Sequence, residues 1–178
     1  MNLILLFDRL KNKIRRSYRE YIFKCRTGCK VNLVGDVILI NTNIKIGRNV
    51  TLYPGVMLWG DGRIEIGDNV NIGNNTVIYA SKFGGGVTIG DDTQIAAQCY
   101  LIDMDHGLNA DDLIRNQNNT VSPINIGKDC WIAANCTILK GSQIGDGAVI
   151  GAKSLVKGAV EGNSISVGIP AKHLKFRE

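Results

Sequence analysis

The chain has 178 residues, of which 44% are apolar, a size that fits one domain with its own core and not two. Aromatic residues make up only 6% whereas glycine occurs 21 times, so we expect a core of small and β-branched side chains, which favours short strands over a helical bundle. The net charge of +5 is uneven: residues 1–30 carry nine Lys or Arg against Asp8 and Glu20, a net +7, which leaves −2 for the remainder. A nearly neutral body does not indicate nucleic-acid binding, despite a pI of about 9.0.

Residues 1–30 are expected to form a basic amphipathic segment that precedes a domain over residues 31–178. Apolar residues recur there at three- and four-residue spacing between basic residues, which predicts an amphipathic helix over roughly residues 2–24. The apolar stripe consists of Leu3, Leu6, Phe7, Leu10, Ile14, Tyr18, Tyr21 and Ile22. The apolar run 3–7 is too short to span a bilayer and no cleavage site follows it, so we expect a cytoplasmic protein. Two interpretations stay open: the stripe covers the open end of the domain, or the helix rests peripherally on the anionic inner face of the cytoplasmic membrane.

An aliphatic residue returns every sixth position along most of the chain. Seventeen such positions fall in four runs: Val34, Ile40, Ile46, Leu52 and Leu58; Ile66, Ile72 and Ile78; Ile89, Ile95 and Leu101; and Ile126, Ile132, Ile138, Ile144, Ile150 and Val156. A period of six fits neither an amphipathic helix nor an ordinary sheet meander. It fits a solenoid in which each hexad forms one short strand and one corner. With three hexads in each triangular coil, the repeat predicts an all-β parallel β-helix of about five to six coils.

Glycine and the breaks in the repeat indicate where the corners lie. Gly or Ala often follows the inward aliphatic residue, as at Gly47 and Gly90, and is expected there because a corner demands unusual backbone angles. Residues 59–63 and 80–86 are short excursions, and residues 103–123 form a longer polar insertion that must leave the prism. Loops that a rigid scaffold projects outward often carry function.

The five cysteines are odd in number and scattered along the chain. Cys99, Cys130 and Cys136 fall at positions that face inward, as expected for small buried side chains in a reducing compartment. Cys25 and Cys29 have no second pair of Cys or His nearby, so we expect no zinc site.

Four segments give the repeat a more specific identity. They are Asp-Met-Asp-His-Gly at 103–107, the Cys-Trp-Ile-Ala-Ala-Asn-Cys block that opens 130–141, Gly-Ala-Lys-Ser-Leu-Val at 151–156, and Val-Gly-Ile-Pro-Ala-Lys at 167–172. With the hexads over roughly residues 31–175, they resemble the sugar and xenobiotic acetyltransferases of the hexapeptide-repeat family. That group includes galactoside, maltose and nodulation-factor acetyltransferases and O-acetyltransferases of surface polysaccharide synthesis. The resemblance implies a left-handed β-helix, a homotrimer with active sites between neighbouring prisms, and acetyl-CoA laid along the later coils.

The resemblance also identifies the catalytic base. Acetyl transfer from a thioester to a sugar hydroxyl needs a base, and neutral imidazole can accept that proton near pH 7. Of the two histidines, His106 begins the long insertion and matches the family's catalytic histidine, whereas His173 lies in the basic tail. Asp103 and Asp105 are expected to orient the imidazole or to bind the acceptor, or else are solvated loop acids.

The remaining site residues are expected from the same resemblance. Ala134 and Ala152 match positions whose backbone contacts CoA, and their small side chains leave room for the pantetheine arm. Lys157, Lys172 and Lys175 are expected to meet the cofactor's phosphates. Trp131 projects outward by its place in the hexad, where it packs on a neighbouring subunit or walls the acceptor cleft. The asparagine that the family often carries near position 81 is not matched, since Ser81 stands there.

Three functions remain in view. The first is O-acetylation of a sugar or surface polysaccharide such as O-antigen or capsule, and the second is N-acetylation of a nucleotide-linked amino sugar. The third is a β-helix that only mediates interactions. A zinc-dependent β-helix hydratase would need three histidines for each metal, and the chain has two, so no metal is expected.

Overall fold

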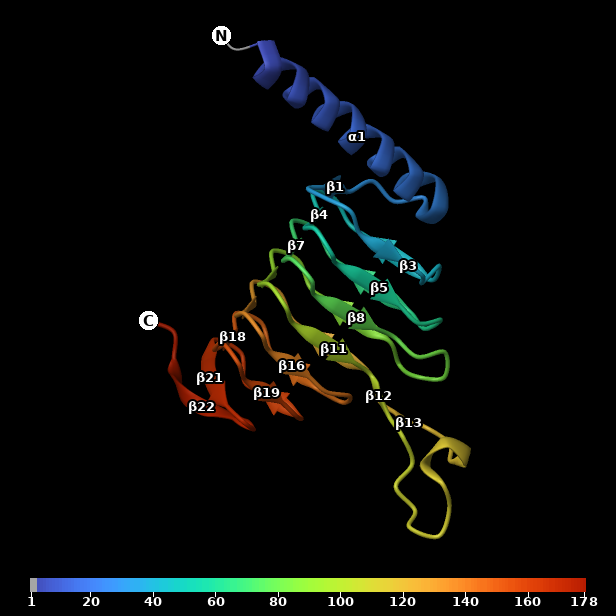
Figure 1. The fold of residues 1–178 in the computed structure, drawn as a ribbon. Coiled ribbons are helices and arrows are strands. Elements are labelled where there is room, and N and C mark those ends of the chain that lie inside the picture. Colours follow the sequence, from blue (N-terminus) through green and yellow to red (C-terminus); the bar gives the residue numbers. More distant parts are fainter. Residues whose placement is uncertain (1–2) are drawn as a thin grey trace.

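The computed structural model describes residues 3–178, with side chains from residue 9 onward (Figure 1). Helix α1 (Leu3–Thr27) precedes a solenoid of short strands. Residue 2 of the expected helix lies outside the described residues, as do the side chains of Leu3, Leu6 and Phe7. Within the described residues, no helix is long and apolar enough to cross a membrane.

The strands stack into three parallel sheets that form the faces of a prism. Sheet A contains β1 (Asn32–Leu33), β4 (Thr51–Leu52), β7 (Asn71–Ile72), β10 (Gln94–Ile95), β15 (Trp131–Ile132), β18 (Val149–Ile150), β21 (Ser164–Gly168) and the antiparallel β22 (Ala171–Phe176). Sheet B contains β2 (Ile38–Leu39), β5 (Met57–Trp59), β8 (Val77–Tyr79), β11 (Tyr100–Ile102), β16 (Thr137–Ile138) and β19 (Leu155–Val156). Sheet C contains β3 (Ile44–Ile46), β6 (Ile64–Ile66), β9 (Val87–Ile89), β14 (Ile124–Ile126), β17 (Gln143–Ile144) and β20 (Ala159–Val160). Because sheets B and C have six strands each, the prism has six complete coils, and β21 begins a seventh. The parallel β-helix is confirmed, at the upper end of the expected number of coils.

The interior is filled by the aliphatic hexad positions. Every expected inward residue from Leu52 to Val156 is at most 4% exposed. In the first coil the expected register is wrong at two of three positions: Val34 and Ile40 are 47% and 51% exposed, and their neighbours Leu33 and Leu39 point inward instead. At both places two apolar residues are adjacent in the sequence, and because side chains of extended backbone alternate between its two faces, spacing alone does not choose between them. The third, Ile46, is partly buried and packs against the core.

The glycines that follow the inward aliphatic residues serve close packing and not unusual backbone angles. A Cβ on Gly90 would lie 2.6 Å from the backbone carbon of Gly127 in the next coil. The left-handed backbone conformation falls instead two residues later, where short polar side chains tolerate it best. Nine non-glycine residues adopt it, mostly at corners: Asn49, Asn69, Asn75, Asp92, Gln98, Asp129, Asn135, Lys153 and Asn163.

The last turns of α1 pack on the first coil. Phe23 is buried, the Arg19 guanidinium lies 2.7 Å from the Asp36 carboxylate, and the Arg26 side chain donates to the Leu39 carbonyl at 2.8 Å. The rest of the helix projects beyond the prism (Figure 1). The stripe residues Leu10, Ile14, Tyr18 and Tyr21 are 56–65% exposed. Ile22, the last residue of the stripe, is 38% exposed and lies beside the first coil, but the buried contact is made by Phe23. The stripe as a whole therefore does not cover the open end.

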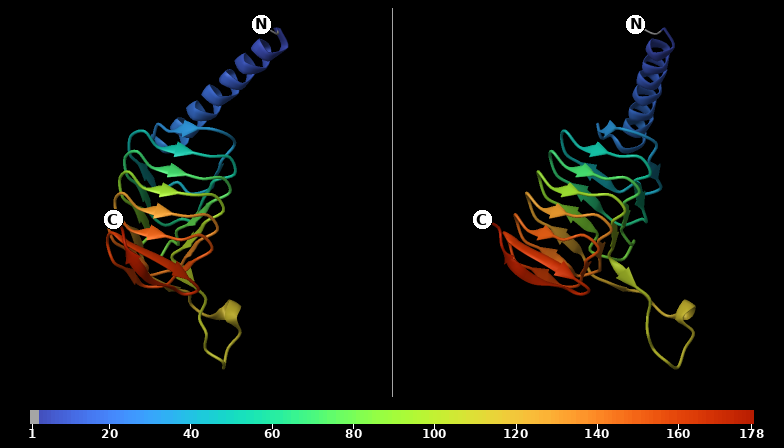
Figure 2. Two further views of the ribbon diagram at one scale, coloured as in Figure 1. Left: turned by 90° about the vertical axis from the view of Figure 1, so that its left-hand side faces the viewer. Right: turned by 60° about the vertical axis from the view of Figure 1, so that its left-hand side comes forward.

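All long excursions leave the prism along one edge, where the chain passes from sheet B to sheet C and which we call edge BC. Residues 59–63, 80–86 and 103–123 lie there in successive coils. The longest of them starts with β12 (Met104–Asp105), which pairs antiparallel with β13 (Thr120–Val121), and carries the short helix η1 (Ile114–Asn116). It extends away from the body as a long projection (Figure 2).

Candidate active site

His106 stands where the insertion 103–123 leaves the prism. It directly follows β12, so the two-residue ladder between β12 and β13 fixes its backbone. Its imidazole is exposed. An exposed imidazole at the base of a projecting loop is accessible to substrates from outside the prism.

Asp103 anchors the insertion to the preceding coil. Its side chain is fully buried, and its carboxylate accepts the backbone N–H of Ser81 at 2.8 Å and that of Gly86 at 3.2 Å. Its own carbonyl accepts the N–H of Ser122 at 3.0 Å, which closes the far end of the insertion. Burial raises the pKa of Asp103, although these hydrogen bonds act in the opposite direction. Asp103 thus joins the excursion 80–86 to both ends of the insertion 103–123 and supports the loop that carries His106.

Asp105 links the insertion to the following coil. Its exposed carboxylate lies 3.5 Å from the Lys140 ammonium, and Lys140 follows β16 on the same edge. Lys140 was not among the expected site residues, although it stands inside the segment 130–141 that carried part of the resemblance. The two aspartates beside His106 therefore differ: Asp103 is a buried anchor and Asp105 an exposed partner of a lysine.

The insertion is also held by its own side chains. Gln117 accepts the N–H of Asn109 at 2.7 Å and donates to the carbonyls of Asn109 and Asp112 at 2.8 and 2.9 Å. The loop tip carries apolar side chains in solvent, with Leu108, Leu113 and Ile114 between 56% and 85% exposed. Such a projection presents an apolar surface to whatever lies beside the prism.

The residues expected to hold the cofactor occupy a different edge, where sheet A passes into sheet B (edge AB). Ala134 and Ala152 stack there in consecutive coils, and the Ala134 carbonyl accepts the N–H of Lys153 at 2.9 Å. Ala152 is exposed and Ala134 half-buried. Lys157, by contrast, lies on edge BC, two coils beyond the insertion.

The other expected residues lie on or beside sheet A. Trp131 points outward from β15 and is 54% exposed. Lys172 and Lys175 are exposed on β22, and the Lys175 ammonium lies 3.1 Å from Glu178. One protomer therefore brings together His106, Asp103 and Asp105 but places the alanines and Trp131 on other parts of the prism.

Two aromatic residues near the root of the insertion were also not among the expected site residues. Trp59 and Tyr79 stand at matching register positions on sheet B, and their rings meet edge-to-face at 5.2 Å between centroids. Burial raises the pKa of Tyr79, and the nearby carboxylates of Asp103 and Asp61 add to that effect. Each directly follows an inward hexad residue, Leu58 or Ile78, and stands at a break in the repeat, which is the signal that could have placed them together.

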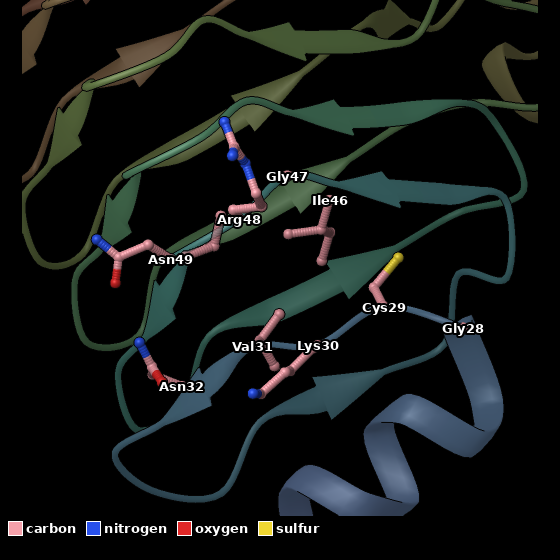
Figure 3. Close-up of a pocket in the computed structure, with 10 residues that line it drawn as sticks. Gly28, Cys29, Lys30, Val31, Asn32, Ile46, Gly47, Arg48 and Asn49 are labelled. Atoms are coloured by element: carbon pink, nitrogen blue, oxygen red, sulfur yellow. The ribbon is translucent and has the colours of Figure 1, made fainter.

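One hollow of the described surface lies far from His106. It has a volume of about 570 Å³ and is lined by residues 28–32 and 46–50 at the N-terminal end of the prism (Figure 3). The Arg48 side chain at its rim lies 2.6 Å from the Asp68 carboxylate, which lowers the pKa of Asp68. No group of three or more potential metal ligands occurs among the described residues.

Comparison with known proteins identifies the family. Residues 123–158 match the family model of the bacterial transferase hexapeptide (six repeats), and residues 63–102 match the hexapeptide repeat of succinyl-transferase. WbbJ of Escherichia coli (strain K12), named for O-acetyl transfer in lipopolysaccharide biosynthesis, is 35% identical over 157 residues, which are 83% of this chain and 79% of WbbJ. The chain belongs to the hexapeptide-repeat acetyltransferases. The prism is accordingly the left-handed parallel β-helix that hexapeptide repeats form.

Two further comparisons show how far this likeness reaches. Rv3034c of Mycobacterium tuberculosis (strain ATCC 25618 / H37Rv), named an acetyltransferase, is 38% identical over 121 residues, 66% of this chain but only 39% of that protein. The crystal structure of a mutant of AntD, an N-acyltransferase from Bacillus cereus in complex with dTDP and coenzyme A, superposes with a TM-score of 0.75. AntD is 22% identical, with 90% of this chain and 89% of AntD covered, so this likeness concerns the fold alone.

Proposed function

We propose that this hexapeptide-repeat acetyltransferase transfers an acetyl group from acetyl-CoA to a hydroxyl group of a sugar or surface polysaccharide. The observation that carries this proposal is the placement of His106, exposed at the root of an insertion that Asp103 anchors. Support for the donor comes from AntD, whose structure contains coenzyme A on the same fold. Support for the acceptor comes from WbbJ, which is named for O-acetyl transfer.

His106 is the proposed general base. The imidazole accepts the proton of the acceptor hydroxyl as the oxygen attacks the thioester carbonyl carbon. The tetrahedral intermediate then expels CoA as the carbon–sulfur bond breaks, and the imidazolium returns the proton to the departing thiolate. Asp105, paired with Lys140, is the proposed neighbour that orients the ring or contacts the acceptor. Backbone N–H groups are the proposed donors to the oxyanion.

We further propose that the active enzyme is a homotrimer. His106 lies on edge BC, whereas Ala134 and Ala152 lie on edge AB and Trp131 lies on sheet A. A cleft between two protomers allows the histidine of one to meet the cofactor residues of the next, with Lys157, Lys172 and Lys175 near the CoA phosphates. The exposed apolar loop tip, with Leu108 at 85% exposure, supports such a neighbour.

A glycan is the proposed acceptor, and Trp59 and Tyr79 support it. Aromatic side chains combine an apolar ring face with a polar tip, which suits the mixed surface of a sugar. A lipid-linked glycan precursor at the cytoplasmic face of the inner membrane is the proposed location of that sugar. N-acylation of a nucleotide-linked amino sugar is the second candidate, which the fold shared with AntD favours.

A panel of acceptors tests the proposal. The enzyme is given acetyl-CoA with simple glycosides, polysaccharide fragments or nucleotide-linked amino sugars, and the acetylated product is identified by mass spectrometry. We expect an ester on a glycan hydroxyl. An amide on an amino sugar would instead support N-acylation, the second candidate. If acetyl-CoA binds and no acceptor in any class is acetylated, the assignment of a sugar acceptor is wrong. If acetyl-CoA does not bind either, the protein is a non-enzymatic β-helix.

A further inference from the structure

The exposed face of α1 is an interaction surface remote from the acetyl-transfer site. We infer that α1 docks the protein on an anionic lipid surface through the stripe formed by Leu10, Ile14, Tyr18 and Tyr21. This inference rests on the proposed function only in that it brings the enzyme to a membrane-linked acceptor. The stripe, its flanking charges and its direction relative to the prism support it.

The stripe faces away from the prism. An α-helix turns about 100° per residue, so Leu10, Ile14, Tyr18 and Tyr21 fall within about 80° of one another. By the same geometry Phe23, the buried residue that packs on the first coil, lies on the opposite side of the helix. The prism thus holds α1 by one side and presents the other side to the surroundings.

Basic side chains flank the stripe on both sides. At about 100° per residue, Lys11 and Arg15 border one side and Lys13 and Lys24 the other. All four are exposed, and none forms an ion pair with any side chain in residues 9–178. The basic residues nearer the prism differ, since Arg16 pairs with Glu20 and Arg19 with Asp36. An apolar stripe between two basic borders is the pattern of a helix that lies in a membrane interface.

The first coil extends the apolar surface at the same end of the molecule. Val34, Ile38 and Ile40 are 45–51% exposed there, in contrast to the buried aliphatic residues of the later coils. A shallow hollow between α1 and this coil is lined in part by Ile22 and by Tyr18, which is the stripe residue nearest to the prism side of the helix. The N-terminal end therefore combines apolar area with unpaired positive charge.

The basic residues beside the stripe favour an anionic lipid surface over a second copy of α1 as the binding partner. In a bundle of identical parallel helices, the borders of neighbouring stripes face one another, and here both borders are basic, so they would repel. Anionic lipid headgroups neutralise the same borders, and each Lys or Arg near such a surface contributes about 1 kcal/mol, or about fivefold in affinity.

Vesicle flotation of the full chain tests the inference. Vesicles of equal parts phosphatidylglycerol and phosphatidylethanolamine are compared with vesicles of phosphatidylcholine, at low and high salt. We expect binding only to the anionic vesicles and weaker binding at high salt. The helix variant K11Q/K13Q/R15Q should bind about a hundredfold more weakly. Gln is a good helix former, so α1 itself should persist.

A matched control separates this surface from net charge. The body variant K45Q/R48Q/K128Q removes the same charge from the prism, where these residues pair with Glu65, Asp68 and Asp91, and it should bind like wild type. The inference is overturned if wild type binds no anionic vesicle or if both triple variants weaken binding equally. It is also overturned if L10Q/I14Q dissociates the oligomer, because the stripe then packs on a second copy. Acetyl transfer to a soluble acceptor is measured alongside and should be unchanged in the helix variant, whatever the vesicles show. Failure of the docking surface and failure of the proposed reaction are therefore distinguishable.

Discussion

Replacement of Asp103 by alanine removes the acceptor for two buried backbone N–H groups. Those of Ser81 and Gly86 donate to its carboxylate at 2.8 and 3.2 Å, and the side chain is fully buried. An unpaired buried donor costs about 1–3 kcal/mol, so two cost about 2–6 kcal/mol. The loss of a buried charge offsets part of this, and we expect a net local destabilisation of about 2–4 kcal/mol. Asp105→Ala is the matched control, because it breaks only an exposed ion pair worth less than about 1 kcal/mol.

Hydrogen exchange read by mass spectrometry is the suitable assay, because a solenoid need not unfold in one step. In Asp103→Ala, peptides that cover residues 80–86 and 103–123 should exchange roughly 30- to 1000-fold faster, while the later coils exchange as in wild type. His106 loses its fixed position with them, so acetyl transfer should fall although acetyl-CoA still binds. Unchanged protection of both peptides would refute the anchoring role of Asp103.

Three further outcomes follow from particular residues. Burial raises the pKa of Asp103, so the neutral acid is favoured in the folded state. The free energy of unfolding of wild type, relative to Asp103→Asn, should therefore fall as pH rises from about 4 through that raised pKa. Urea unfolding measures this, and a difference that does not change with pH would contradict it. Gly90→Val places atoms where a Cβ alone meets the backbone of Gly127 at 2.6 Å, so it should destabilise the chain by about 1–3 kcal/mol, and an unchanged denaturation midpoint would count against this packing. In native protein a thiol reagent should modify exposed Cys25 first, and the buried Cys99, Cys130 and Cys136 only after unfolding; labelling of all at one rate would disprove their burial.

The repeat predicted most of the fold because each hexad satisfies the same local rule. From Leu52 onward the expected inward positions are buried, and the six-residue spacing alone identified them. The first coil was assigned the wrong register because Leu33 and Val34, and likewise Leu39 and Ile40, offer two apolar residues in sequence. The glycines that follow the inward aliphatic residues were expected at the right positions, but for unusual backbone angles and not for the close packing of neighbouring coils. The distance between stacked coils is set by tertiary packing, and the residue spacing within one coil does not predict it.

The site was predictable where one loop carries it and not where several coils meet. His106 and the start of the insertion follow from the break in the hexads. The anchoring of Asp103 to Ser81, the pairing of Asp105 with Lys140, and the contact of Trp59 with Tyr79 all join different coils. Such contacts depend on the lengths of the excursions at edge BC. For α1, the amphipathic pattern predicted a stripe but not which side of the helix would pack on the prism.

The measurement that tests the central claim most directly is the rate of acetyl transfer by His106→Ala, with His173→Ala as the matched control. Both histidines are exposed, and they are the only two in the chain. If His106 is the general base, its variant should lose about two to four orders of magnitude in rate while acetyl-CoA binding is retained, and His173→Ala should remain close to wild type. A His106→Ala enzyme as fast as wild type would contradict the assignment of the base, although the β-helix would stand.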